Sequence, residues 1–214
     1  MSELTTLAGG GTAPTPAVTK QPLPPIIDGD YLIDVIPYHG DLDPNSRFFL
    51  SYFWQRLHDD GLLDLYFPGA GDKSYCTFVK LFSSNTRIVI VVRKVPTTGD
   101  IVDTIGFATW DALQLGPALV GHAGFIFLKE FWNRHTTLAA AKRIERFWFD
   151  DESPRLDMAL GIIAEDNRMA QMLMHRLGWV QAGVLPGLHE YAGKPSNATI
   201  WYLTREEFEA QESR

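Results

Sequence analysis

Residues 165–179 read EDNRMAQMLMHRLGW, and this stretch decides the fold. It follows an apolar run over residues 156–164, which predicts a strand. Small or apolar side chains then recur at helical spacing: Ala170, Leu173 and Leu177. Asn167 stands where a helix N-cap is expected, and the pair Gly178-Trp179 closes the stretch. The pattern predicts a strand followed by a short amphipathic helix over residues 168–177.

The rest of the chain, read outward from this stretch, alternates between strand and helix patterns. Strands are predicted over residues 31–38, 87–95, 101–110, 118–128, 180–185 and 198–203. Helices are predicted over 46–58, with Asn45 or Ser46 as cap, over 72–82 and 136–149, and from Arg205 onward. Thr98-Gly99-Asp100 is expected to form a hairpin turn. This order of elements predicts a mixed α/β sheet.

Composition limits the classes of function. Hydrophobic residues make up 45% of the 214 residues, enough for one domain with a real core. The net charge of −7 argues against a surface for nucleic acid. Cys76 is the single cysteine, so neither an internal disulfide nor a thiolate metal cluster is expected, and no metal is assigned. Without a signal-peptide pattern or an apolar run of about 20 residues, we expect a cytoplasmic protein and no membrane partner.

The first 27 residues differ from the rest of the chain. They are rich in glycine and proline, almost uncharged and poor in large apolar side chains. Such a segment buries too little surface to offset its loss of conformational entropy, so we expect a flexible leader over 1–27 and a globular domain over 28–214. The leader is either a disordered tail or an arm that becomes ordered on a protein partner.

The pattern Asn-x-x-Ala-x-x-Leu-x-x-x-Leu-Gly-aromatic, at 167–179, resembles the second cofactor-side motif of the GNAT N-acetyltransferase superfamily. A further stretch, EFWNRHTTLAA at 130–140, is similar to the phrase Glu-Tyr-Trp-Gly-Lys-Gly-x-Ala-Thr-Glu-Ala of the branch that holds the ribosomal-protein N-terminal acetyltransferases. Asn133 and His135 stand at its two glycine positions. The resemblance covers about residues 30–208. It implies a GNAT-like α/β (α+β) fold, with a mixed, mostly antiparallel central sheet flanked by helices and a flexible N-terminal extension.

The resemblance implies acetyl-CoA as cosubstrate. Backbone N–H groups at a helix start bind phosphate, which implies a pyrophosphate site at Asn133, Arg134, His135, Thr136 and Thr137. The His135 ring would either crowd the pyrophosphate or, when protonated, pair with it. The resemblance assigns the pantetheine arm to the backbone of Phe127, Leu128 and Lys129, on a strand that splays from its neighbour. It assigns further cofactor contacts to Asn167 and Ala170, although helix capping alone also explains Asn167.

The implied reaction is attack of a neutral amine on a thioester, which needs a base, an oxyanion donor and an acid. Met174 stands where many GNAT enzymes carry a tyrosine acid. His122 and Glu165 are the candidate bases. The alternatives are a histidine that a strand neighbour satisfies and a solvated or capping carboxylate.

Two functions of different class follow. The first is an acetyl-CoA-dependent N-acetyltransferase acting on a protein N-terminus, a lysine or a small-molecule amine. The second is a catalytically degenerate GNAT-fold binding or structural protein, by analogy a phage accessory or virion component. The first implies a bacterial host cytoplasm and the second allows the virion. Both a monomer and a dimer through exposed sheet edges are compatible with the sequence.

Overall fold

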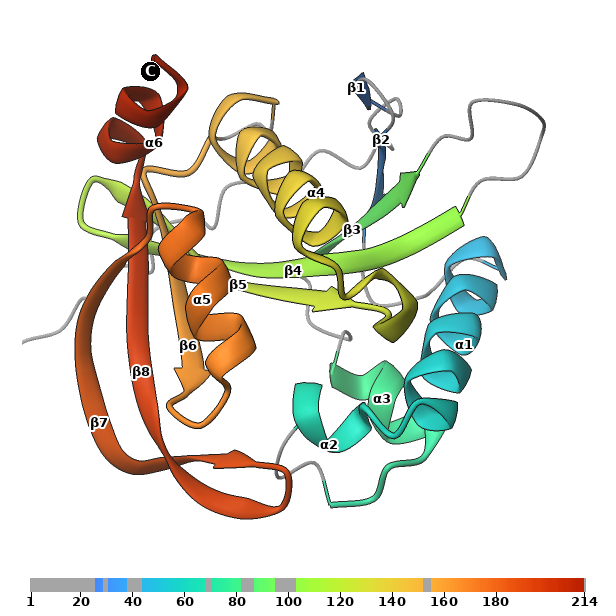
Figure 1. Cartoon of the computed structure of the whole chain (residues 1–214). Coiled ribbons are helices and arrows are strands. Elements are labelled where there is room, and N and C mark those ends of the chain that lie inside the picture. Colours follow the sequence, from blue (N-terminus) through green and yellow to red (C-terminus); the bar gives the residue numbers. More distant parts are fainter. Residues whose placement is uncertain are drawn as a thin grey trace, which may run out of the picture.

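The computed structural model describes residues 26–28, 31–37, 44–67, 71–81, 87–94, 103–151 and 155–213. These ranges form one eight-stranded sheet in the order β1-β2-β3-β4-β5-β6-β8-β7 (Figure 1). The strands are β1 Ile26–Asp28, β2 Tyr31–Pro37, β3 Arg87–Lys94, β4 Asp103–Leu115, β5 Ala118–Phe127, β6 Met158–Ala164, β7 Val180–Tyr191 and β8 Lys194–Thr204. Every neighbouring pair is antiparallel except β5 and β6, so the predicted mixed, mostly antiparallel sheet is confirmed.

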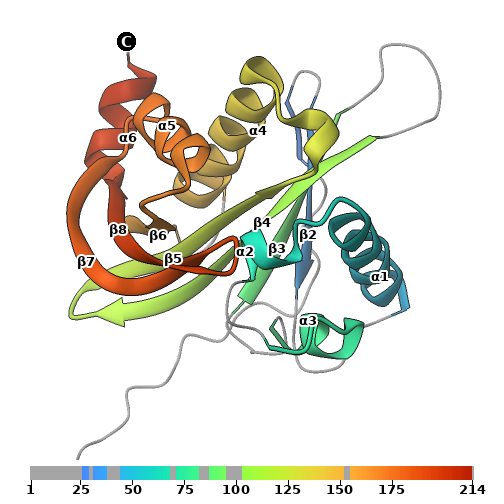
Figure 2. The same ribbon diagram turned by 60° about the horizontal axis from the view of Figure 1, so that its bottom comes forward.

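Helices cover both faces of the sheet. They are α1 Pro44–Asp59, α2 Leu63–Tyr66, α3 Tyr75–Leu81, α4 Arg134–Arg146, α5 Arg168–Arg176 and α6 Arg205–Glu212. A 3-10 turn over Lys129–Phe131 precedes α4, and a π-helical segment over Phe147–Asp151 extends it. Figure 2 shows α4, α5 and α6 above the sheet and α1 and α3 below it.

The structure corrects several predicted boundaries. β1 begins at Ile26, inside the predicted leader, because Ile26 pairs with Ile33 of β2. α1 begins at Pro44, so neither Asn45 nor Ser46 is its cap; proline suits the first helical position, where no intrahelical N–H bond is lost. β4, β7 and β8 are all longer than predicted, and the four-residue helix α2 has no counterpart among the predictions. Residues 1–25 and the predicted turn at 98–100 lie outside the described ranges.

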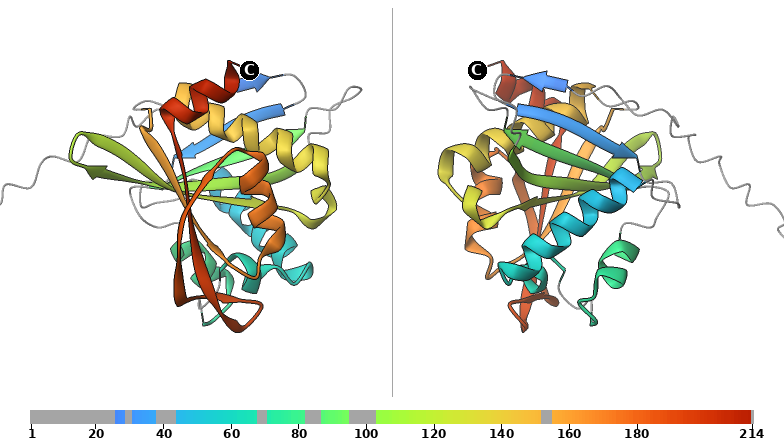
Figure 3. Two further views of the ribbon diagram at one scale, coloured as in Figure 1. Left: turned by 60° about the vertical axis from the view of Figure 1, so that its left-hand side comes forward. Right: turned by 90° about the vertical axis from the view of Figure 1, so that its right-hand side faces the viewer.

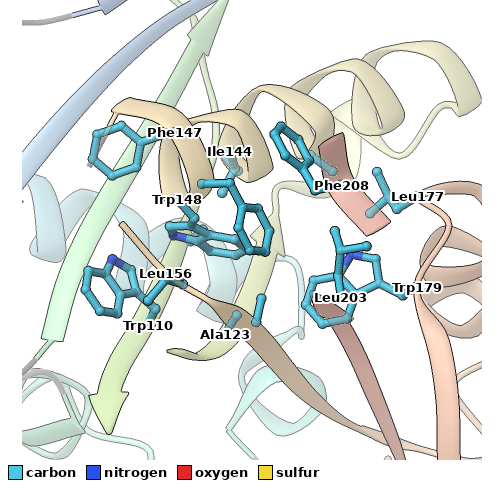
Figure 4. Packing of buried hydrophobic residues seen from close by; sticks show 14 of the residues in the cluster. Trp110, Ala123, Ile144, Phe147, Trp148, Leu156, Leu177, Trp179, Leu203 and Phe208 are labelled. Atoms are coloured by element: carbon cyan, nitrogen blue, oxygen red, sulfur yellow. The ribbon is translucent and has the colours of Figure 1, made fainter. Parts of the chain in front are cut away.

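Two apolar clusters lie on opposite faces of the sheet. The cluster beneath α4, α5 and α6 contains the two largest fully buried side chains, Trp201 and Trp148. Figure 4 shows Trp148 within this cluster. The other lies under α1, where Phe53 meets Phe107 of β4 edge to face with ring centroids 4.7 Å apart. The predicted stripe of α1 is buried at Phe49, Leu50, Phe53 and Leu57. α1 lies across the sheet in Figure 3, right.

The Leu-Gly-Trp sequence at 177–179, after α5, has a physical reason. Gly178 follows α5 with φ of +74°, a left-handed conformation that side chains with a Cβ avoid. This turn sends Trp179 back into the core, where its indole N–H donates to a carboxyl oxygen of Glu145 of α4. The turn therefore ties the end of α5 to α4.

None of the helices within the described ranges has the length and apolar content that a membrane crossing requires. Within the same ranges, no three potential metal-ligating side chains of His, Cys, Asp or Glu gather at one point.

Candidate active site

β5 and β6 part after a short parallel ladder. Their paired residues run from Val120–Met158 to His122–Leu160, whereas β5 pairs with β4 along its whole length. Beyond His122, β5 continues to Phe127 and β6 to Ala164 without pairing to each other. The predicted splay of these strands is thus present, and it leaves the edge of β5 without a ladder partner on the β6 side.

The hydrogen bonds of β5 show which residues face the parting. Leu119 exchanges bonds with Asp157 on the β6 side: its N–H donates to the Asp157 carboxylate at 2.7 Å, and its carbonyl accepts the Asp157 N–H at 2.8 Å. Main-chain groups alternate along a strand, so those of Ala123, Phe125 and Phe127 turn the same way. Phe125 was missed from the sequence, because only the register decides which residues face this side.

Phe127 faces the parting, but its main-chain groups are already engaged. The Tyr66 hydroxyl of α2 donates to the Phe127 carbonyl at 3.0 Å and accepts the Phe127 N–H at 3.2 Å. The Trp132 indole N–H donates to the same carbonyl at 2.9 Å. Burial raises the pKa of Tyr66 to about 12, so the phenol stays protonated and keeps its donor.

The other two residues predicted for the pantetheine arm are also engaged. The Leu128 N–H donates to Ile105 of β4 at 2.9 Å, and the Leu128 carbonyl accepts from Phe131 at 3.0 Å. The Lys129 carbonyl accepts the Trp132 N–H at 3.1 Å. These bonds build the 3-10 turn that leads into α4.

The N-terminus of α4 holds the residues predicted for pyrophosphate. Asn133 has φ −119° and ψ 151°, ordinary extended angles that need no glycine. Its Oδ1 accepts the Thr136 N–H at 2.9 Å, and its carbonyl accepts the Thr137 N–H at 3.1 Å. The N–H groups of Arg134 and His135, first and second in the helix, have no intrahelical acceptor and can meet an anion.

The N-terminus of α5 contains the second predicted contact. Asn167 caps the helix, with its Oδ1 accepting the Ala170 N–H at 3.1 Å. Asn167 is therefore a helix cap, and its predicted contact with the cofactor stays a prediction. Glu165 lies just before this cap and accepts a 2.6 Å bond from the Asn197 side-chain amide of β8.

The structure does not bring the two candidate bases together. His122 is exposed on β5, on the face that Ile126 shares with α1, and it lies opposite Asp111 of β4. Leu160 of β6 pairs with His122. Glu165 is five residues beyond Leu160, and five residues of extended chain span about 16 Å. Only His122 lies where the two strands begin to part. Met174, at the position of the expected tyrosine, is buried.

The arrangement of β5, α4, β6 and α5 around this parting is the GNAT N-acetyltransferase fold. Spermidine N-acetyltransferase from Vibrio cholerae, solved in complex with CoA and spermine, matches with a TM-score of 0.65 and 14% identity over 85% of this chain and 99% of that chain. Ribosomal-protein-S5-alanine acetyltransferase from Vibrio fischeri matches with a TM-score of 0.64 and 14% identity, over 86% and 98%. No family model and no curated protein sequence matches the chain. At such identity the likeness establishes the fold and not the reaction.

Proposed function

We propose that this protein is an acetyl-CoA-dependent N-acetyltransferase that acetylates an amine. The observation that carries the proposal is the open edge of β5. After a 3-10 turn the chain continues into α4, whose first two N–H groups have no intrahelical acceptor. An extended amide-bearing arm fits such an edge, because it can take the place of a missing strand. The negative end of the same molecule fits the helix start. The residues present fit coenzyme A at these two places, and Tyr66 contacts Phe127 at the first of them.

In this proposal the N–H groups of Arg134 and His135 hold the pyrophosphate, and the backbone of Phe125 and Phe127 holds the pantetheine arm. Bound acetyl-CoA supplies an activated thioester. Thr136 and Thr137 keep the helix start in shape, since the Thr137 hydroxyl donates to the Phe131 carbonyl at 2.8 Å. Asn167 and Ala170 shape the start of α5 beside the parting.

His122 is the proposed general base. Its side chain lies at the point where the strands part, and imidazole titrates in the range that proton transfer from an ammonium group near neutral pH requires. Asp111 lies directly opposite on β4, so both side chains stand on one face of the sheet. We assign Asp111 a positioning role, in which its carboxylate favours the protonated imidazole. Glu165 is the weaker candidate because Asn197 already binds it.

Isothermal titration of acetyl-CoA into the full chain tests the cofactor assignment, and an amine panel tests the reaction. The panel should contain a polyamine, free lysine and peptides with different N-terminal residues. Release of coenzyme A thiol is the readout, and the Cys76→Ser variant removes the exposed thiol that would react with the dye. Binding at micromolar acetyl-CoA with turnover of one amine supports the proposal. If neither wild type nor Tyr66→Phe, a variant that frees Phe127, binds acetyl-CoA, the proposal is overturned in favour of a binding or structural protein.

The base assignment is tested on that acceptor. We expect His122→Ala to lower kcat by about 100-fold with the Kd for acetyl-CoA unchanged. If Asp111 is a positioning carboxylate, Asp111→Asn should shift the acidic limb of the kcat profile to lower pH, because the imidazolium loses a favourable neighbour. An unchanged limb would contradict this role. His58→Ala on α1, an exposed histidine that contacts Asp59 and Trp54, is the matched control and should keep wild-type kcat.

A further inference from the structure

Tyr66 occupies main-chain groups that a bound pantetheine arm would use. Its single hydroxyl meets both the N–H and the carbonyl of Phe127, which is how a neighbouring strand would satisfy this edge. The two amides of a pantetheine arm offer the same pair of groups, a donor from one amide and an acceptor from the other. We infer, on the basis of the proposed function, that Tyr66 is an autoinhibitory latch that competes with acyl-coenzyme A for the edge of β5.

The latch is held from outside the parting. Asp64 of α2 forms an ion pair with Lys73 at 2.8 Å, and the Lys73 ammonium also donates to the Phe67 carbonyl at 3.0 Å. The Lys73 carbonyl in turn accepts the Trp54 indole N–H of α1 at 3.0 Å. α2 is therefore fastened on both sides of Tyr66. The Asp64 side chain is 62% exposed, so salt screens this ion pair and weakens the fastening.

Binding must exchange one set of hydrogen bonds for another. While Tyr66 is in place, Phe127 is satisfied, so the coenzyme gains little there until the phenol leaves. Apparent affinity is then reduced by the small fraction of molecules in which the latch is open. Trp132 differs from Tyr66, because its indole N–H takes only the second lone pair of the Phe127 carbonyl and leaves the N–H to others.

Removal of one oxygen atom tests the latch. Tyr66→Phe keeps the ring and removes both bonds to Phe127. The matched control is Tyr75→Phe on α3, whose hydroxyl likewise donates to a main-chain carbonyl, that of Arg47, at 3.1 Å. Two readouts are needed: titration of acetyl-CoA and of coenzyme A, and hydrogen exchange of the Phe127 amide measured by NMR without ligand.

We expect Tyr66→Phe to bind acetyl-CoA about tenfold more tightly than wild type, a fold change worth about 1.4 kcal/mol. The Phe127 amide should exchange faster in the same variant, and Tyr75→Phe should change neither quantity. Lys73→Met, which frees α2 without touching Phe127, should also tighten binding, by less than Tyr66→Phe does.

Each contrary result points to a different failure. Equal or weaker binding by Tyr66→Phe, where wild type binds, overturns the latch and leaves the proposed function standing. Unchanged exchange at Phe127 overturns the latch whether or not any coenzyme binds. Faster exchange with no binding in any folded variant overturns the proposed function, and the contact is then structural and not inhibitory.

Discussion

The helices α4 and α5 both begin with an asparagine cap. The motif of the resemblance has an asparagine at the start of α5 but a glycine at the start of α4. Asn133 and Asn167 each accept the N–H three residues ahead, at 2.9 and 3.1 Å. At α4 this cap replaces a glycine of the resemblance and uses the Thr136 N–H, which would otherwise stay available at the helix start. Helix stability and anion binding therefore compete for one amide, and α4 favours stability.

The two helices are joined at their far ends. Trp179, just after α5, donates its indole N–H to Glu145 near the end of α4, and both side chains are buried. Figure 4 shows Trp179 beside Leu177 and Leu203, in the cluster that α4 covers. The shared end and the two helix starts should therefore respond differently to substitution.

The largest expected effect comes from breaking the shared end. Trp179→Ala removes a buried indole and leaves the Glu145 carboxyl without its donor, so we expect a loss of about 3–5 kcal/mol in the free energy of unfolding. Urea denaturation at neutral pH measures it. Met172→Ala, at an exposed position on α5, should cost less than about 0.5 kcal/mol. If Trp179→Ala loses no more stability than Met172→Ala, α4 and α5 are not coupled through Trp179.

A smaller effect should depend on pH. Burial raises the pKa of Glu145 to about 8, although the hydrogen bond from Trp179 lowers it in part. The folded protein thus holds a proton that the unfolded chain releases near its ordinary pKa of 4.5. This contribution to stability is complete below pH 4.5 and is lost as the pH rises through 8.

Glu145→Gln should remove this pH dependence. Its free energy of unfolding should rise relative to that of wild type by on the order of 2–4 kcal/mol between pH 5 and pH 8. Urea denaturation of both proteins at several pH values gives the difference, in which all other titrating groups cancel. A constant difference would show that Glu145 ionises in the folded state as it does in the unfolded chain.

The smallest effects separate the two caps. Asn133→Ala and Asn167→Ala should each cost about 1 kcal/mol of stability. Their acetyl-CoA affinities should differ: Asn133→Ala frees the Thr136 N–H and should bind about threefold more tightly, on the scale of one net hydrogen bond, whereas Asn167→Ala should not. Weaker binding by Asn133→Ala would place the Asn133 side chain itself on the phosphate.

The sheet and the main helices were predictable because their patterns are local. The stripe of α1 and the stretch ending at Gly178-Trp179 each follow from residue spacing, and the resemblance added the splay of β5. Tyr66 was not predictable, since α2 is a single turn without periodicity, and its contact with Phe127 spans 61 residues of sequence. The separation of His122 from Glu165 likewise depends on strand register, which no residue pattern records.

The parallel pairing of β5 with β6 has a consequence for how the chain folds. β1 with β2, β3 with β4 and β4 with β5 pair between neighbouring segments of the chain. The other pairings bridge longer stretches: β2 and β3 pair across α1, α2 and α3, β5 and β6 across α4, and β6 and β8 across α5 and β7. Closing such long loops is slow compared with hairpin formation. We therefore expect the hairpins to form first and the parting between β5 and β6 to be completed late during folding, when β6 joins β5.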